Sequence, residues 1–329
     1  MKIKMGLGFL FILLTAFVFF IQASSSPVVP NSSPIKIAVS QTPLSSPFII
    51  AQHLKLFDQK HINVEFVSCS GGVACANALF NNEVDFATAS ESVVMFESFK
   101  HDDLSVLTSF AESSNDLKLL ALGKGKITSI DELEGKKVGV VKASASEFYF
   151  DSLLIAHNLI RAQVQRVYLA PNELNNALIT GGVDAISVWE PYGYAVMLES
   201  PDIINLGLEG VYNLTFNLLT RSSPEEQHMT NSVIILEQLN KAIQWMNAQP
   251  EQAKSIVAKA LNIPRTQLDW SWQDYTFRLS IGNALLSNLQ LQARWAIETE
   301  LVEGALPNYR RVLSPEALEH VMNRTVSYE

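Results

Sequence analysis

Residues that could hold a small molecule recur at the points where apolar runs of the sequence end. Hydroxyl, glycine, amide and carboxylate groups gather there, and most of these points precede a predicted helix. Backbone N–H groups at a helix start, together with serine hydroxyls, can cradle an anion. Serine and glycine are also ordinary helix caps, but six such loops meeting at one cleft favour a binding site. The candidate ligand-binding residues are Gln41, Thr42, Ser70, Gly71, Gly72, Ser90, Glu112, Ser144, Ser146, Trp189, Glu190 and Tyr192.

The segment Trp189-Glu190-Pro191-Tyr192 is the most specific of these candidates. An indole and a phenol next to a carboxylate, at the end of a buried strand, can stack on a small organic ligand and orient it. Pro191 should end the strand and direct Tyr192 to the side. In the alternative interpretation, Trp189 belongs to the core and Glu190 ties two parts of the protein together.

The sequence gives little support for catalysis or metal binding. Its two cysteines, Cys69 and Cys75, form either a small-loop disulfide, as in many exported proteins, or a pair of semi-buried thiols near a helix start, and both interpretations stay open. Without a nearby histidine they do not make a zinc site. We find no nucleophile–base pair and no metal-ligand spacing in the sequence. We therefore expect no catalytic residue, no metal and no cofactor.

The elements that must position these residues alternate between strands and helices. Such alternation predicts an α/β protein with mostly parallel sheets flanked by helices. After residue 220 the pattern predicts only helices, at 233–246, from Pro250 onward, and at 283–303 and 314–323. The predicted strands cover 35–39, 62–67, 85–89, 104–110, 117–122, 137–141, 164–168, 184–188 and 215–220.

One motif occurs twice in the chain, 99 residues apart. Residues 78–90 and 177–189 each have the pattern of a helix end, a tight turn and a short apolar strand that begins with Val-Asp. Two similar α/β units predict two lobes with a ligand cleft between them. We expect the first lobe to comprise residues 35–112 and 215–329, and the second 117–210. The chain should then cross between the lobes near 111–117 and 208–216.

The N-terminus is typical of an export signal. Lys2 and Lys4 precede an uncharged run from Met5 to Ile21, and small residues follow it. Basic start, apolar middle and small-residue end are the parts of a signal peptide, which we assign to residues 1–26. We expect a periplasmic protein. An uncleaved membrane anchor is the alternative, because this run is near the short limit for a membrane span.

The composition is that of a globular protein and excludes some partners. The chain has 329 residues, of which 17% are charged and 48% hydrophobic, enough for two domains with buried cores. Its formal charge of −9 argues against nucleic acid as a partner, because phosphate binding requires clustered basic residues.

The motifs together resemble the periplasmic solute-binding components of ABC importers, in the nitrate, sulfonate, taurine and thiamine-precursor group. The likeness rests mainly on Leu-Glu-Gly-Lys-Lys-Val-Gly-Val at 133–140 and on Val-Asp-Ala at 183–185 leading into the Trp-Glu-Pro-Tyr segment, and it covers about residues 35–325. The resemblance implies a two-lobe type II binding-protein fold with a helical C-terminal extension. It also implies a monomer that captures a small solute between its lobes and delivers it to an ABC permease and its ATPase subunits.

The charge of the solute is less well defined by the sequence. Four glutamates, Glu91, Glu112, Glu147 and Glu190, fall near the cleft loops, and Lys142 is the one basic residue there. Unpaired carboxylates in a closed cleft disfavour an anion. This favours a neutral or cationic solute such as a pyrimidine or an amine, while sulfonates, taurine and nitrate stay open.

Two other functions fit the same fold. One is an enzyme of thiamine-pyrimidine or menaquinone synthesis, although the synthases that resemble this group carry a clustered cysteine motif that this sequence lacks. The other is a periplasmic sensor that presents solute to a membrane receptor.

Overall fold

Two separate β-sheets, each with helices packed on it, organise the chain. The computed structural model describes residues 33–60, 62–123, 127–159 and 163–326, with side chains described as far as residue 323. The predicted signal peptide, residues 1–26, lies outside the described residues.

The first sheet has six strands in the order β11-β4-β10-β3-β1-β2. β1 pairs in parallel with both β2 and β3. In the pair with β2, the register runs from Ile35 opposite Val64 to Ser40 opposite Cys69. β10 pairs antiparallel with β3 and β4, and β11 pairs antiparallel with β4. The bounds are β1 (Ile35–Ser40), β2 (Val64–Cys69), β3 (Phe86–Ser90), β4 (Leu104–Ser113), β10 (Leu214–Arg221) and β11 (Tyr275–Ser280).

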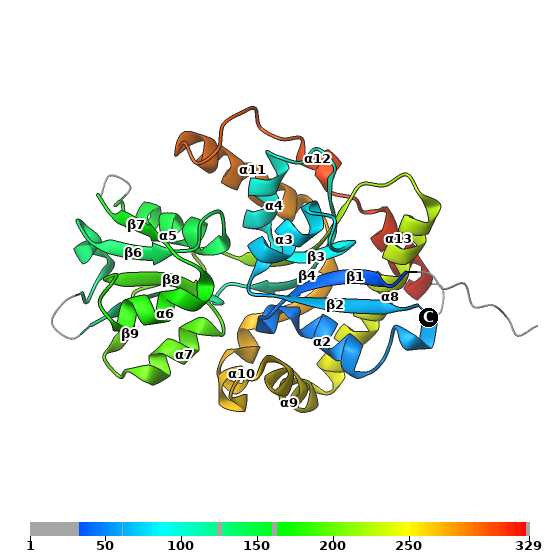
Figure 1. The fold of residues 1–329 in the computed structure, drawn as a ribbon, viewed down its shortest axis with the longest axis horizontal. Helices are drawn as coiled ribbons and strands as arrows, with labels where there is room; N and C mark the ends of the chain where they lie inside the picture. Colours follow the sequence, from blue (N-terminus) through cyan, green and yellow to red (C-terminus); the bar gives the residue numbers. More distant parts are fainter. Residues whose placement is uncertain (1–32, 61, 124–126, 160–162, 327–329) are drawn as a thin grey trace, which may run out of the picture. The chain divides into compact units, whose positions relative to one another are not determined.

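The second sheet has five strands in the order β7-β6-β8-β5-β9 and contains the middle of the chain (Figure 1). β6 pairs in parallel with β7 and β8, whereas β5 pairs antiparallel with β8 and β9. The bounds are β5 (Leu117–Leu122), β6 (Lys137–Val140), β7 (Gln165–Tyr168), β8 (Ala185–Trp189) and β9 (Ile203–Asn205).

Both sheets are therefore mixed, and the expectation of mostly parallel sheets was wrong in this respect. Parallel neighbours require a long crossover connection, usually a helix. β4 instead leads directly into β5 of the other sheet through residues 114–116, and β10 follows β9 after residues 206–213. The strands that carry the chain from sheet to sheet are antiparallel to a neighbour.

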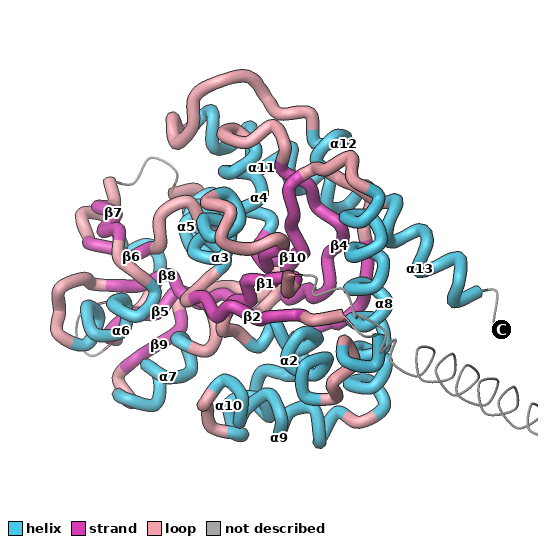
Figure 2. Tube along the Cα trace, turned by 45° about the vertical axis from the view of Figure 1, so that its right-hand side comes forward, coloured by secondary structure: helices cyan, strands magenta, loops and turns pink. Residues whose placement is uncertain are grey.

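Helices cover both sides of the first sheet. In Figures 1 and 2, α3 and α4 lie on one side of β1, and α2, α9 and α10 lie on the other. α5, α6 and α7 pack on the second sheet. The bounds are α2 (Ser46–His53), α3 (Gly72–Phe80), α4 (Glu91–Ser98), α5 (Ala145–Ala156), α6 (Pro171–Ile179) and α7 (Tyr192–Glu199).

The C-terminal region is helical, as expected, with one exception. β11 lies within it and adds an edge strand to the first sheet, which the sequence interpretation had assigned to no element. The helices of this region are α8 (Glu226–Ala248), α9 (Pro250–Leu261), α10 (Arg265–Ser271), α11 (Asn283–Glu298), α12 (Tyr309–Val312) and α13 (Glu316–Val326).

The duplicated motif folds in the same way in both sheets. α3 leads through a turn into β3, and α6 leads through a turn into β8. In the first copy, the Asp85 carboxylate accepts a hydrogen bond from the backbone N–H of Lys36 at 2.8 Å, and the Asp85 N–H donates to the Lys36 carbonyl. In the second copy, Asp184 and Lys137 form the same reciprocal pair, with the carboxylate bond at 2.9 Å. The Val-Asp of the motif thus joins the incoming strand to its neighbour in each sheet.

The core of the first sheet reaches the ends of its strands. Phe48 of α2 packs edge-on against Phe110 of β4 at 5.0 Å between ring centroids, and Phe110 packs against Phe216 of β10 at 5.7 Å. Phe216 also borders a cavity, so the packed core forms one wall of the site described next.

Candidate ligand-binding site

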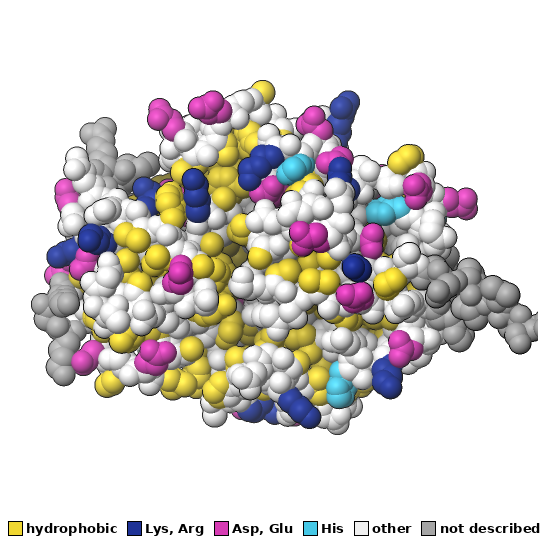
Figure 3. All heavy atoms as spheres, viewed as in Figure 1, with side chains coloured by type: hydrophobic (Ala, Val, Ile, Leu, Met, Phe, Trp, Pro, Cys, Tyr) yellow, Lys and Arg dark blue, Asp and Glu magenta, His cyan; other side chains and the backbone are white. Residues whose placement is uncertain are grey.

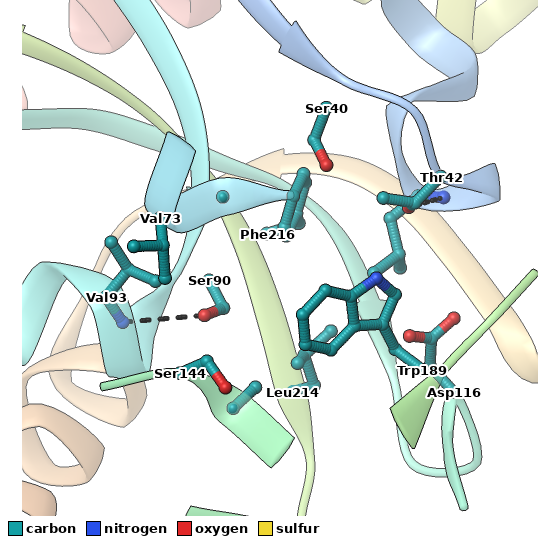
Figure 4. Close-up of a pocket in the computed structure, with 13 residues that line it drawn as sticks. Ser40, Thr42, Val73, Ser90, Val93, Asp116, Ser144, Trp189, Leu214 and Phe216 are labelled. Atoms are coloured by element: carbon teal, nitrogen blue, oxygen red, sulfur yellow. Dashed lines mark hydrogen bonds between the residues drawn. The ribbon is translucent and has the colours of Figure 1, made fainter. Parts of the chain in front are cut away.

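A cavity lies where the two sheets meet, at the ends of β1, β3 and β8 (Figure 4). The cavity measures about 30 Å³, room for a water molecule, so a small solute would fit there only if the walls moved apart. Both sheets and one of the segments that connect them contribute to its walls. The lining residues are Ser40, Thr42, Leu44, Gly72, Val73, Ser90, Val93, Asp116, Ser144, Ala145, Trp189, Leu214 and Phe216.

Three helices begin at this cavity. α3 starts at Gly72 without a side-chain cap, so its first backbone N–H groups have no partner within the described residues. α4 is capped by Ser90, whose hydroxyl accepts from the N–H of Val93 at 3.5 Å. α5 is capped by Ser144, whose hydroxyl accepts from the N–H of Ser146 at 3.2 Å. Helix starts carry partial positive charge, so this side of the cavity attracts an anionic or acceptor group.

Two glycines allow close contact at the start of α3. A Cβ atom on Gly72 would lie 3.0 Å from Cα of Ala89, so α3 can approach β3 this closely only without a side chain. A Cβ on Gly71 would lie 3.1 Å from the Trp189 ring. The loop of the first sheet and the last residue of β8 in the second sheet are therefore almost in contact beside the cavity.

Two further hydroxyls line the cavity near the end of β1. Thr42 accepts from the N–H of Leu44 at 3.0 Å, and its own hydroxyl proton has no acceptor in the described part of the chain. Ser40 is fully buried, and its Oγ has no hydrogen-bond partner among the described residues. Both hydroxyls can donate to a bound molecule.

Asp116 supplies the carboxylate of the cavity. It lies in the segment between β4 and β5 and is 2% exposed. Its Oδ1 accepts from the hydroxyl of Tyr275 at 2.9 Å, whereas Oδ2 has no partner within the described chain. Figure 4 shows this carboxylate on the opposite side of the Trp189 ring from the hydroxyls of Ser90 and Ser144. The Asp116 carboxylate and the serines that cap α4 and α5 thus lie on opposite sides of the Trp189 ring.

The electrostatic environment of Asp116 disfavours its charge. Burial, and after it the negative charge of Glu190, raise the pKa of Asp116 to about 7. The opposing effects of the Tyr275 hydrogen bond and the Lys118 ammonium are smaller. Lys118 donates to the carbonyl of Asn115 and, at 2.9 Å, to its side-chain oxygen.

The four glutamates that the sequence placed near the cleft do not line the cavity, and each has its own partners. Glu91 accepts from Thr215 and Tyr212, and Glu112 pairs with Arg278 at 3.0 Å. Glu147 accepts from the hydroxyl of Tyr168 and the N–H of Ala143, and Glu190 accepts from Gln267 and the N–H of Tyr194. The argument against an anionic solute from unpaired glutamates therefore fails.

Lys142 likewise does not line the cavity. Its ammonium lies 5.5 Å from the centre of the Tyr168 ring.

The structure brings five of the twelve candidate residues to the cavity wall: Thr42, Gly72, Ser90, Ser144 and Trp189. Gly71 lies directly behind, against the Trp189 ring. Ser146 is buried one residue further along α5, where its hydroxyl accepts from the N–H of Val141. Gln41 and Ser70 are exposed beside the cavity.

Tyr192, Glu190 and Glu112 lie outside the cavity wall. Tyr192 is the first residue of α7, and its ring packs edge-on against Trp189 at 6.3 Å. Glu190 is fully buried and accepts a hydrogen bond from the Gln267 amide at 3.0 Å. This bond joins the turn after β8 to α10, in line with the alternative interpretation that Glu190 ties two parts of the protein together. Glu112 borders a different groove, together with Arg278 and the start of α11.

Several lining residues were not predicted from the sequence. Asp116 was assigned to the segment that crosses between lobes, and the apolar residues Leu44, Val73, Val93 and Leu214 belong to helices or strands whose facing residues cannot be read from one sequence. The position of Asp116 directly before β5 was the one clue that the sequence offered.

Other features of the described residues concern the cysteines, metals and membranes. Cys69 and Cys75 are both buried free thiols, and a hydrogen bond from Cys75 lowers the pKa of Cys69.

Across the described ranges, no group of three or more His, Cys, Asp or Glu residues is placed to hold a metal ion, and no helix is long and apolar enough to cross a membrane. On the face drawn in Figure 3, Lys and Arg side chains stand among Asp and Glu side chains.

Comparison with solved structures defines the class of fold. The alkanesulfonate-binding protein SsuA from Xanthomonas axonopodis pv. citri, solved bound to MOPS, superimposes with a TM-score of 0.76 at 17% identity, covering 86% of this chain and 98% of that one. The periplasmic aliphatic sulphonate binding protein SsuA from Escherichia coli gives 0.73 at 20% identity, over 86% and 93% of the two chains. The chain therefore has the fold of the periplasmic binding proteins, as expected.

The sequence places the chain in a family within that class. It belongs to the NMT1/THI5-like family, whose model matches residues 42–253. A Bacillus subtilis (strain 168) protein named for aliphatic sulfonate binding is 26% identical over 228 residues, 68% of each chain. An Escherichia coli (strain K12) protein with the same name is 23% identical over 308 residues, 91% of this chain and 95% of its own.

Proposed function

We propose that this protein is the extracytoplasmic solute-binding subunit of an ABC importer and binds a small organic solute in the cavity between its two sheets. The observation that carries the proposal is the cavity itself, which is bordered by three helix starts and by residues of both sheets. Ligands of open α/β folds collect at the ends of strands in this way. The family and the names of the relatives also support binding without catalysis. Export rests on the signal peptide predicted over residues 1–26.

We propose that the two sheets belong to two lobes, residues 35–112 with 215–329 and residues 117–210, which close on the solute. The distribution of strands supports this, because β1–β4, β10 and β11 form one sheet and β5–β9 the other. Short segments, 114–116 and 206–213, connect the sheets and suit a hinge. The near contact of Gly71 with Trp189 supports lobes that approach each other beside the cavity.

Closure can be tested by small-angle X-ray scattering. With a saturating, confirmed solute, the radius of gyration should decrease from that of the solute-free protein, because the lobes approach each other. The Gly71→Ala variant should show a smaller decrease, since its methyl group would lie 3.1 Å from the Trp189 ring in the arrangement described here. Superimposable profiles with and without solute would rule out the hinge.

Solute binding can be tested by thermal denaturation against sulfonates, nitrate, amines and pyrimidines. A solute that binds only the folded protein raises its melting temperature. The Val73→Trp variant should abolish the shift, because Val73 lines the cavity and is only partly buried, so a larger side chain fills the site. Asn77→Trp is the control, since Asn77 lies exposed one turn further along α3. A shift that survives in Val73→Trp would place the site elsewhere.

A further inference from the structure

Two polar atoms beside the cavity have no partner within the described residues: Oδ2 of Asp116 and Oγ of Ser40. Both residues line the cavity, and both are nine-tenths buried or more. Buried polar groups in native proteins are almost always hydrogen-bonded, so each exception requires an explanation. Neither atom has accessible surface in this arrangement, and a molecule that enters as the cavity walls move apart would supply both missing partners.

The two atoms differ in what they can bind. The Ser40 hydroxyl can donate or accept, as can the hydroxyls of Thr42 and Ser90 on the same walls. An ionised Asp116 can only accept, and it is the one acidic residue among those that line the cavity. Lys118, whose ammonium acts on the Asp116 carboxylate, already donates to both oxygens of Asn115. Oδ2 is therefore left to accept from a positive or N–H-bearing group of a solute.

We propose that Asp116 determines specificity by receiving a protonated or N–H-bearing nitrogen of the solute, whose acceptor group lies toward the helix starts of α3, α4 and α5. This inference rests on the proposed function and narrows its solute to small amines or amino-substituted heterocycles that also carry an anionic or acceptor group. The Trp189 ring and the apolar walls cover the short carbon framework between the two groups.

The environment of Asp116 makes such a solute a better partner than water. The carboxylate is buried beside Glu190 and accepts a hydrogen bond from the hydroxyl of Tyr275. In a closed cavity with little water, attraction between a carboxylate and a cation is much stronger than at a protein surface. A cation at Oδ2 would also offset the repulsion from Glu190, which an anion would increase.

The test compares matched compounds that differ only in the nitrogen: taurine with ethanesulfonate, and aminopyrimidine with pyrimidine. Isothermal titration calorimetry measures each on the wild type, on Asp116→Asn and on Glu112→Gln. Glu112 is a partly buried carboxylate outside the cavity and serves as the control. For at least one pair, the wild type and Glu112→Gln should bind the amino compound at least about tenfold more tightly, since a paired charge in a closed site contributes on that scale. Asp116→Asn should remove the preference.

The pH dependence gives a second readout that a structural role would not produce. Protons compete with a cation for Asp116, so affinity of the wild type for taurine, whose amine stays protonated in this range, should fall from about pH 8 to about pH 5. The groups that face Asp116 are Tyr275, Lys118 and Glu190, and of these Glu190 has its pKa raised to about 6 by burial. The Asp116→Asn profile should retain only the weaker Glu190 contribution. Asp116→Ser, with its fold checked by melting, replaces Asp116→Asn if the latter does not fold.

The outcomes separate this inference from the proposed function. Equal binding of both members of each pair by the wild type, abolished by Val73→Trp, would overturn the role of Asp116 and leave the solute-binding function intact. A preference that persists in both Asp116 variants would overturn it as well. Binding of none of the four compounds would overturn the inference, whereas the proposed function is decided by the thermal-denaturation screen with Val73→Trp.

Discussion

The Glu91→Ala variant should lose about 3–5 kcal/mol of its free energy of unfolding, because breaking a buried polar network leaves several groups without partners. Glu91 is fully buried at the start of α4. It accepts from the Thr215 N–H at 2.8 Å and the Thr215 hydroxyl at 3.0 Å, and from the Tyr212 hydroxyl. Two amides of α11 also donate to it, from Asn288 at 3.1 Å and Gln292 at 3.3 Å. Urea unfolding of both proteins measures the loss.

Glu91→Gln separates shape from charge in this network. The glutamine fills the same space as Glu91, but its NH2 group must face hydrogen-bond donors. The free energy of unfolding should therefore fall by about 1–2 kcal/mol, less than in Glu91→Ala. Burial raises the pKa of Glu91 to about 7. A raised pKa in the folded state gives stability that is present below the unfolded pKa and is lost as the pH rises through the folded value. The advantage of wild type over Glu91→Gln should therefore be larger near pH 4 than near pH 8, and a constant difference would contradict this assignment.

The Trp189→Ala variant should bind solute about 2–3 kcal/mol more weakly, roughly 30- to 150-fold in Kd, as for other central aromatic residues of binding sites. The Trp189 side chain is 8% exposed, lines the cavity and packs against the loop at Gly71. Its removal takes away one wall and a contact between the two sheets. Calorimetry with a solute identified by thermal denaturation measures the change.

Tyr192→Ala is the matched control for this prediction. Tyr192 touches Trp189 edge-on but does not line the cavity, so its removal should cost less affinity than the removal of Trp189. Trp189→Phe should fall between wild type and Trp189→Ala, because a smaller ring keeps part of the wall. A larger loss in Tyr192→Ala than in Trp189→Ala would mean that the solute contacts the tyrosine instead.

Most of the fold could be predicted because its signals are local. Short apolar runs mark the strands, and cap residues mark several of the helices that follow them. The repeated Val-Asp marks the same turn twice. β11 was missed although Tyr275, Phe277 and Leu279 alternate with polar residues. A single short alternation among helices is a weak signal, and the pairing with β4 that stabilises it spans more than 160 residues of sequence.

The site was harder to predict, because it depends on which side chains face one another across the chain. Thr42, Gly72, Ser90 and Ser144 follow from the rule that ligands collect where strands end and helices begin. Asp116 does not, since its importance arises from Tyr275 and Glu190, distant residues that bury it and leave one oxygen without a partner. The side chains that pair with the four glutamates lie at least 21 residues away in sequence, so this pairing could not be inferred.

The reciprocal hydrogen bonds of Asp85 with Lys36 and of Asp184 with Lys137 allow local opening of the two sheets to be compared by hydrogen exchange. Each bond protects one backbone amide, that of Lys36 or Lys137, in the same chemical setting at corresponding places in the two sheets. Exchange of an amide proton with solvent requires its hydrogen bond to open, and the rate reports the free energy of that opening. The ratio of the exchange rates of the two amides therefore compares the local opening of one sheet with that of the other in a single sample.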